Sequence, residues 1–356
     1  MWSREPHTND LDNNLTIERT TIALDAMGGD FAPVETVAGA VLAARETDVA
    51  VLLVGDPNPL QEQLDAHPGA ADLPISVAPS MGVVGEGEQP ARALRQKPNA
   101  SIFVATKLVK EGRAGACVSM GSTGASMAAA AVILGMMEGL ERPCLGGPIV
   151  GLAPRTIIID VGTNVDCKPA QLLSFAIIGE VFANQFWHID RPKVALLSVG
   201  SETGKGNKQV RETTELLQAS GLNFVGNVEG NDLPAGTVDV VVCDGFAGNV
   251  VMKLTEGIGV SLIQHLASAV NGQVTPEAMN LIKGEILKTT NPAQALGGGP
   301  LLGVNGVSII GHGRADAIEV ANAIATAKLA LDLGFIERLT ERLATVRATV
   351  EVGSEI

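Results

Sequence analysis

Residues 238–251 read VDVVVCDGFAGNVV, and this stretch sets the pattern for the rest of the chain. It opens with a short β-branched run, which favours a strand buried on both faces, as in a parallel sheet. Asp244 ends the run, and Gly245 and Gly248 free the backbone to turn. Asn249 suits the cap of a helix that begins at the next residue. The unpaired N–H groups of that helix predict a seat for a phosphate or an oxyanion.

The same order of apolar strand, glycine-containing loop and helix recurs along the chain. This alternation predicts a three-layer α/β/α fold with a mainly parallel sheet. Ligands of such folds bind where the carboxyl ends of strands meet, so the polar and glycine residues of these loops are the site candidates. The candidates for phosphate or acyl binding are Gly28, Gly29, Asp30, Gly121, Ser122, Thr123, Gly124, Asn164, Asp166, Lys168, Asn207, Asp244, Gly245, Gly248 and His312.

Composition excludes several classes of function. The 356 residues carry a formal net charge of −14, which argues against a nucleic-acid-binding surface. Tyrosine is absent and aromatic residues make up 3% of the chain, so platforms for base stacking are not expected either. The four cysteines lack the paired spacing of a zinc site or a disulfide framework. We therefore expect a cytoplasmic protein, with no metal site.

The chain reads as one folded unit with two tails. Residues 1–20 are polar and lack the apolar core of a signal peptide, which predicts a disordered N-terminal extension. Residues 21–346 are expected to form a single α/β domain. Within it, residues 250–290 read as two helices, an excursion suited to membrane or dimer contact, and residues 297–303 read as a flexible crossing. A short final helix and a tail at residues 347–356 close the chain.

Two residues are the strongest catalytic candidates. Lys205 stands between two glycines in GSETGKGN, where it is either a mobile solvated lysine or a compact cation reaching over a phosphate; the second interpretation is favoured. Asn249 can cap a helix and still donate its amide to a developing oxyanion. The Gly-Lys spacing does not match a Walker A loop, and Asn207 stands where a magnesium-binding hydroxyl is needed, so nucleotide binding is not expected.

Other polar residues leave two interpretations open. Asp160, Asn164, Asp166 and Lys168 follow one strand and either stiffen their loop by pairing or contact a substrate. Cys167 is a conceivable acyl-accepting nucleophile, but no histidine lies near it in sequence, so an unreactive small residue is favoured. His312 is a proton carrier or a simple hydrogen-bonding residue.

Six motifs in order resemble those of one bacterial family. They are ALDAMGGD at residues 23–30, SMGSTGA at 119–125, DVGTNVDCKP at 160–169, NVEGNDLPAG at 227–236, VVVCDGFAGN at 240–249 and GGPLLGVNG at 298–306. The series is similar to that of the phosphate acyltransferases of phospholipid synthesis (PlsX), across residues 21–328. Three positions depart from the family pattern: Ser122 replaces an amide, Gly204 a polar or basic residue, and Ala295-Leu296 a polar or acidic residue followed by tyrosine.

The resemblance implies transfer of a fatty acyl group from acyl carrier protein to inorganic phosphate, with no cofactor. It also implies a fold like that of isocitrate and isopropylmalate dehydrogenases and phosphotransacetylases, and a homodimer. The acyl phosphate product would pass to a membrane glycerol-3-phosphate acyltransferase (PlsY), which is consistent with peripheral contact at the inner face of the membrane. The family's lysine and asparagine fall on Lys205 and Asn249.

The chemistry needs little more than positioning. Phosphate is already nucleophilic and a thiolate leaves readily, so we expect backbone N–H groups of residues 121–125 and 245–249 to hold phosphate, with Lys205 as cation. A basic group is either a dock for the acidic carrier protein or a solvated helix face. It comprises Arg92, Arg95, Lys97, Lys107, Lys110 and Arg113.

The sequence leaves three other functions open. The nearest is an acyl-CoA-type phosphotransacetylase, which has similar chemistry and a different carrier. The others are a decarboxylating dehydrogenase on the same fold and a protein that binds acyl groups or phosphate without turnover.

Overall fold

The computed structural model describes residues 19–354 apart from 271 and 293–295, with the backbone alone given for 351–354. Residues 1–18 of the expected disordered extension lie outside the described residues, as does Ala295 of the departing pair. The first strand begins at Thr20.

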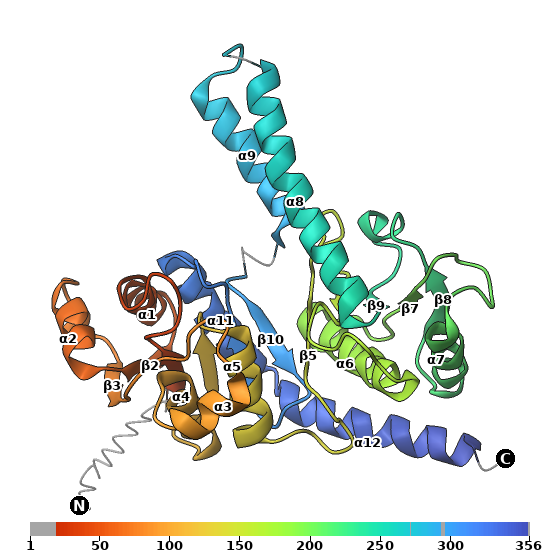
Figure 1. The fold of residues 1–356 in the computed structure, drawn as a ribbon, viewed down its shortest axis with the longest axis horizontal. Helices are drawn as coiled ribbons and strands as arrows, with labels where there is room; N and C mark the ends of the chain where they lie inside the picture. Colours follow the sequence, from red (N-terminus) through yellow and green to blue (C-terminus); the bar gives the residue numbers. More distant parts are fainter. Residues whose placement is uncertain (1–18, 271, 293–295, 355–356) are drawn as a thin grey trace, which may run out of the picture.

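The described residues form an eleven-stranded sheet with helices on both sides (Figure 1). The strand order is β3-β2-β1-β4-β11-β10-β5-β6-β9-β7-β8. The strands are β1 Thr20–Asp25, β2 Val49–Gly55, β3 Ile75–Pro79, β4 Ala116–Ser119, β5 Cys144–Gly147, β6 Ile157–Ile159, β7 Val194–Leu197, β8 Phe224–Val228, β9 Val240–Val242, β10 Gly299–Leu302 and β11 Val307–Ile310.

The helices connect and cover these strands. They are α1 Val34–Glu46, α2 Pro57–Asp65, α3 Pro90–Gln96, α4 Ser101–Lys110, α5 Thr123–Ala129 with the π turn η2 Ala130–Leu134, α6 Pro169–Trp187, α7 Lys208–Ala219, α8 Gly245–Val270, α9 Pro276–Thr290, α11 Ala317–Asp332 and α12 Phe335–Ser354. Two 3-10 turns, η1 Ala70–Asp72 and η3 Leu233–Ala235, lie in loops.

Alternating side chains of the central strands divide the core into layers. In β9, Val241 packs in the cluster that contains Met252 of α8, whereas Val240 and Val242 pack in the cluster that contains Phe175 of α6. Because successive strand residues point to opposite faces, α8 and α6 cover opposite sides of the sheet. This arrangement confirms the predicted three-layer fold with a mainly parallel sheet.

The sheet consists of two parallel sets that run in opposite directions. One set is β3-β2-β1-β4-β11 and the other is β6-β9-β7-β8. Between them, β10 is antiparallel to both β11 and β5, and β5 is antiparallel to β6. These three reversals place β5 and β10 at the junction of the two halves.

Helices α8 and α9 form an arm that projects from the body (Figure 1). Three of the described residues of α8 are buried, and all three are glycines. Apolar side chains such as Leu254 (60% exposed) and Leu281 (70% exposed) face outward. By length and composition α8 is the one described helix that could cross a membrane. Helix α8 begins five residues before the expected start of the two-helix excursion.

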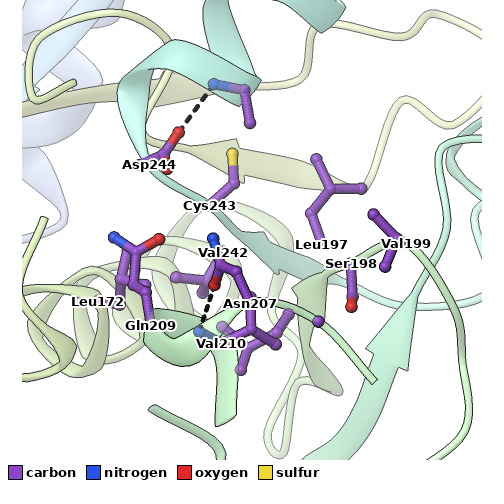
Figure 2. Close-up of a pocket in the computed structure, with 13 residues that line it drawn as sticks. Leu172, Leu197, Ser198, Val199, Asn207, Gln209, Val210, Val242, Cys243 and Asp244 are labelled. Atoms are coloured by element: carbon purple, nitrogen blue, oxygen red, sulfur yellow. Dashed lines mark hydrogen bonds between the residues drawn. The ribbon is translucent and has the colours of Figure 1, made fainter. Parts of the chain in front are cut away.

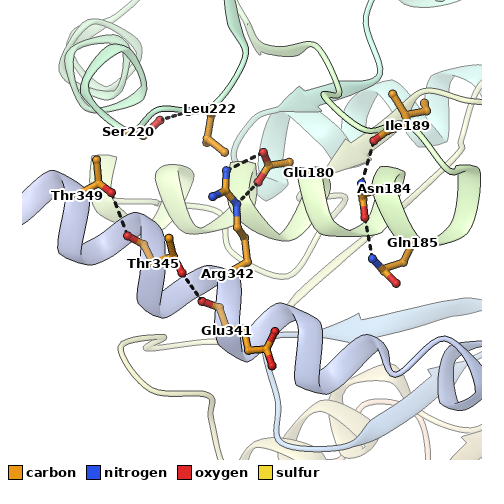
Figure 3. A network of polar contacts seen from close by, with 10 residues as sticks. All are labelled: Glu180, Asn184, Gln185, Ile189, Ser220, Leu222, Glu341, Arg342, Thr345 and Thr349. Carbon is orange, nitrogen blue, oxygen red and sulfur yellow. Dashed lines mark hydrogen bonds and ion pairs between the residues drawn. The ribbon is translucent and has the colours of Figure 1, made fainter.

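The C-terminal helix α12 is fastened to α6 by an ion pair (Figure 3). Arg342 donates from Nε and Nη2 to the two carboxylate oxygens of Glu180, at 2.7 and 2.9 Å. This hydrogen bonding raises the pKa of Arg342, so the guanidinium stays charged. Helix α12 extends to Ser354, well into the range where a tail is expected from sequence.

Short elements account for the other differences from the expected fold. Strands β5, β8 and β10 and helix α3 were not predicted, and β10 occupies residues expected to be a flexible crossing. Strand β10 contains a glycine and a proline, which carry no strand signal. It forms because Leu301 and Leu302 are buried and its ends pair with β11 and β5.

Candidate functional site

Helix α8 begins at Gly245, and Asp244 rather than Asn249 caps it. The backbone N–H of Ala247 donates to Oδ1 of Asp244 at 2.8 Å. The predicted capping role of Asn249 is therefore wrong, because the glycines are already helical. Asn249 is exposed in the second turn of α8, where its amide is not engaged as a cap.

The expected phosphate seat at this helix is largely occupied by the protein itself. The N–H of Gly245 donates to the carbonyl of Asn164 at 2.7 Å, and the N–H of Gly248 donates to the carbonyl of Asp244 at 3.0 Å. With Ala247 also engaged, Phe246 has the one N–H in this first turn without a partner among the described residues. The α8 terminus thus offers a single free donor.

The loop after β6 is held together by the buried carboxylate of Asp160. Its oxygens accept hydrogen bonds from Thr163, from the backbone N–H of Asn164 at 2.7 Å and from Nδ2 of Asn164 at 2.9 Å. Asn164 is also buried and donates to the carbonyl of Pro143. For these two residues the contacts match the loop-stiffening interpretation.

Asp166 and Lys168 lie on the outside of the same loop. Both are exposed, and Nζ of Lys168 lies 3.3 Å from a carboxylate oxygen of Glu141. Lys168 also precedes α6, where its backbone N–H donates to Oε1 of Gln171 at 2.8 Å. Neither residue lines the two cavities described below.

A buried carboxyl group lies beneath the loop after β4, and the sequence reasoning missed it. Oδ2 of Asp25 accepts from the Ser119 hydroxyl at 2.7 Å, and that hydroxyl accepts from the N–H of Gly121 at 3.0 Å. Asp25 is 2% exposed, and a Cβ on Gly28 would lie 2.5 Å from its Oδ2. Burial raises the pKa of Asp25, while hydrogen bonds to it act in the opposite direction. The sequence signal for this group was Asp25 itself, an acidic residue at the end of an apolar strand.

The N-terminus of α5 has unoccupied donors. Ser122 caps the helix by accepting from the N–H of Ala125 at 3.4 Å. The N–H groups of Thr123 and Gly124 have no partner among the described residues. Helix α5 continues directly into the π turn η2. Of the two helix termini predicted to hold an anion, this one therefore has more N–H groups without a partner among the described residues.

Gly28, Gly29 and Asp30 border this loop from β1. Gly29 adopts a positive φ of 104°, and a Cβ there would lie 3.1 Å from Cβ of Met120. Asp30 is exposed, and its carboxylate lies 3.6 Å from Nε of Arg314. The loops after β1, β4 and β11 thus lie side by side, as their common edge predicts.

A cavity of about 520 Å³ brings together site residues from both halves of the sheet. Thr123, Asn249 and His312 all line it, and each is exposed. Most of the remaining lining is apolar or glycine, and it comes from α6, α8, α11 and loops as well as from the unpredicted strands β5 and β10. Apolar members include Leu145, Ile149, Val161, Met252, Ile310 and Leu329.

A smaller cavity of about 250 Å³ lies between the ends of β7 and β9 (Figure 2). Asn207 and Asp244 line it, and Asn207 caps α7 by accepting from the N–H of Val210 at 2.9 Å. Lys205 is exposed on the neighbouring loop and lines neither cavity. The structure therefore places Asn207 beside Asp244, while the Lys205 side chain lies outside the cavity that Asn249 lines.

The cysteine chemistry matches the favoured interpretation of Cys167. Burial, with Asp160 and Asp244 nearby, raises the pKa of Cys167 to about 12. Its thiol donates to the carbonyl of Asn164 at 3.3 Å. Cys167 is thus a protonated thiol at neutral pH, which disfavours a nucleophilic role. Among the described residues no group of three or more potential ligands is placed to hold a metal ion.

The predicted basic group is split between free and engaged side chains. Nζ of Lys97 pairs with Glu88 at 2.7 Å, and Lys107 and Lys110 donate to backbone carbonyls. Arg92 and Arg95 are exposed on α3, where Nε of Arg92 donates to Oε1 of Gln96 at 3.1 Å. That helix begins at Pro90, whose ring would lie 3.0 Å from a Cβ on Gly124. The exposed arginines thus belong to a helix that starts beside the α5 terminus.

Comparison with solved structures gives the same fold at low sequence identity. A phosphotransacetylase from Streptococcus pyogenes superposes with a TM-score of 0.56 at 17% identity, covering 92% of this chain and 94% of that one. A putative 4-hydroxythreonine-4-phosphate dehydrogenase from Salmonella typhimurium superposes with a TM-score of 0.51 at 14% identity, covering 87% and 99%.

Comparison with protein sequences is more specific. The family described as "Fatty acid synthesis protein" matches residues 20–338. The phosphate acyltransferase of Elusimicrobium minutum is 43% identical over 337 residues, covering 93% of this chain and 98% of the relative. That of Thermosynechococcus vestitus is 44% identical over 332 residues, covering 91% and 94%. The chain therefore belongs to the phosphate acyltransferase (PlsX) family.

Proposed function

We propose that this protein transfers a fatty acyl group from acyl carrier protein to inorganic phosphate in phospholipid synthesis. A phosphate oxygen attacks the thioester carbonyl carbon, the new C–O bond forms and the C–S bond breaks. The thiolate leaves and takes up a proton, and the product is an acyl phosphate. No oxidant, reductant or covalent enzyme intermediate is needed for this balance.

One observation supports this function above the others. Polar residues from both halves of the sheet, Thr123, Asn249 and His312, line a largely apolar cavity. A thioester carbonyl at that polar rim would have an amide donor beside it and an apolar space for its chain. Donors positioned at a developing oxyanion typically contribute about 10²–10³ in rate.

The seat of the phosphate is revised from the sequence expectation. The free N–H groups of Thr123 and Gly124 at the α5 terminus would hold it, because the α8 terminus has one free donor. Asn249 would polarise the thioester oxygen. Lys205 would supply the cation from a loop in which the flanking Gly204 and Gly206 adopt positive φ angles of 89° and 100°. His312 would form a hydrogen bond to the phosphate at the same rim.

The carrier protein is proposed to dock on α3. Arg92 and Arg95 are exposed there, and the helix starts next to the α5 terminus. Acyl carrier protein is acidic, so complementary charge would steer its association despite the net charge of −14 on this chain. Charge reversal of Arg92 and Arg95 should therefore lower the association rate in a salt-dependent way.

The arm is proposed to bury its apolar face against a second copy of the chain. Leu254 and Ile258, one turn apart on α8, and Leu281 on α9 are large apolar side chains that are exposed in the single chain. Pairing of two arms would give a homodimer. The tip of each arm would remain free for peripheral contact with the membrane that carries the next acyltransferase. Analytical ultracentrifugation, with and without lipid vesicles, separates the two contacts.

The nearest alternative is an acyl-CoA phosphotransacetylase, since the phosphotransacetylase of Streptococcus pyogenes shares this fold. The deciding experiment incubates the protein with phosphate and either palmitoyl-carrier protein or palmitoyl-CoA, and follows acyl phosphate. The proposal expects repeated turnover with the carrier protein and a much lower kcat/KM with the CoA ester. A preference for CoA would favour the alternative, and binding without turnover would remove both.

A further inference from the structure

The hydrogen-bonded ladder between β5 and β10 stops halfway, at the junction of the two halves. Their paired positions are Leu145 with Leu301 and Cys144 with Leu302. Beyond these, the last residues of β5 pair with β6 and the first residues of β10 pair with β11. Pro300 lacks an N–H and so cannot extend the ladder.

Glycines occupy the strand positions beside this break. A Cβ built on Gly147 meets nothing within 4 Å, and one on Gly299 meets a single backbone oxygen at 3.7 Å. Both glycines line the large cavity. The missing side chains therefore leave open space where the two strands part.

The large cavity has lining residues from both faces of the sheet. Asn249 and Met252 come from α8, whereas Phe182, Phe186 and Trp187 come from α6. Because α8 and α6 cover opposite faces, the cavity passes from one face to the other at the break between β5 and β10. A passage of about 520 Å³ with largely apolar walls suits a flexible hydrocarbon chain.

The far end of the passage is an aromatic wall. The rings of Phe182 and Phe186 stack with centroids 4.4 Å apart, and Trp187 meets Phe182 edge-on at 5.4 Å. Such mutually packed rings are held in place by several partners, including Phe335 of α12. They form a fixed stop rather than a flexible lining.

We infer that the passage between β5 and β10 holds the acyl chain of the substrate, with Gly147 keeping it open and the Phe182–Phe186–Trp187 wall limiting chain length. This inference rests on the proposed function, since it takes the carbonyl end of the chain to lie at the rim formed by Thr123, Asn249 and His312. Beyond the proposed function, the inference names the residues that determine which acyl chains the protein accepts.

The test is a graded series at Gly147, read by chain length. A Cβ at position 147 meets nothing within 4 Å, so Gly147→Ala and Gly147→Leu add side chains of increasing size to the passage. We expect Gly147→Leu to lower kcat/KM for the palmitoyl donor by about tenfold or more relative to the butyryl donor, with Gly147→Ala in between. The butyryl donor is the control within each variant, because its short chain does not reach the side chain added at position 147.

A second variant tests the aromatic wall, and it keeps the inference testable if the Gly147→Leu protein fails to fold. Phe186→Leu shortens the wall and should shift the preferred donor from palmitoyl toward longer saturated chains. Displacement of a fluorescent fatty acid from each variant by palmitate gives a readout that needs no turnover. Gly147→Leu should weaken that binding by a similar factor.

The outcomes separate this inference from the proposed function. If wild-type protein makes no acyl phosphate from any donor yet loses palmitate binding in Gly147→Leu, the function fails and the passage stands. If wild-type protein is active but the series changes all chain lengths equally, the passage is refuted and the function stands. An unchanged profile in both Gly147→Leu and Phe186→Leu also refutes it.

Discussion

A Cβ atom built on Gly248 would lie 1.9 Å from the carbonyl oxygen of Asp160. The first turns of α8 therefore rest directly on the backbone that ends β6. Gly245 makes a similar approach, with Asn164 backbone atoms 2.8 and 2.9 Å from its hypothetical Cβ. The glycines of the DGFAGN segment serve close packing between two loops, which in turn places Asn249 on the cavity rim.

Gly248→Ala should destabilise the protein by about 2 kcal/mol or more, because one of two backbones must move. Gly257→Ala on the same helix is the matched control, since a Cβ there meets nothing within 4 Å. That change should instead stabilise by about 0.5–1 kcal/mol through helix propensity. Urea unfolding of both variants measures the difference, and equal effects would contradict the packing argument.

At the start of α8, we expect one side chain to cap the helix and a different one to take part in catalysis. Asp244→Ala should lower the free energy of unfolding by about 1 kcal/mol, because it removes the cap on Ala247. Asn249→Ala should leave stability nearly unchanged and lower kcat by about 10²–10³. Thermal unfolding and steady-state kinetics on the two variants decide this. A large loss of stability in Asn249→Ala would argue for a structural role.

Some parts of the structure could be predicted from the sequence and others could not. Strands such as residues 240–242 were predicted because they are β-branched and buried on both faces. The position of Asn249 relative to the cap was not, because helix starts depend on whether glycines such as Gly245 join the helix. Strand β10 was missed because tertiary pairing, rather than local propensity, makes it a strand. The cavity depends on that strand and so could not be predicted either.

Cys167 should be dispensable for turnover. Its pKa of about 12 means that almost no thiolate exists at neutral pH, and the cause is burial together with Asp160 and Asp244. Cys167→Ala should retain kcat within about twofold, since no covalent intermediate is proposed. Alkylation of Cys167 in the native protein should accelerate about tenfold per pH unit up to pH 11. Loss of activity in Cys167→Ala, with trapping of an acyl-thioester on wild type, would overturn the direct mechanism.

The buried carboxyl of Asp25 should make stability fall with rising pH. Its pKa is raised above the ordinary 3.8, so the native state keeps a proton that the unfolded chain has released. Stability from this group is therefore full below about pH 4 and is lost as pH rises toward the native pKa. Asp25→Asn removes the charge and retains an acceptor for Ser119. Unfolding free energies measured across this range should favour the variant increasingly as pH rises, whereas parallel curves would refute the prediction.

Lys205 gives the sharpest test of the proposed phosphate seat, because the structure shows its side chain exposed and outside both cavities. If it reaches over the site when phosphate binds, Lys205→Ala should raise the KM for phosphate by roughly 10- to 100-fold, the value of one charge-assisted hydrogen bond. The KM for the acyl donor should change little. Lys208→Ala is the matched control, since Lys208 is equally exposed nearby and pairs with Glu212 at 3.5 Å. Near-normal turnover of Lys205→Ala at low phosphate would remove the lysine from the mechanism. The α5 terminus would then hold the phosphate by backbone N–H groups without a cation from this loop.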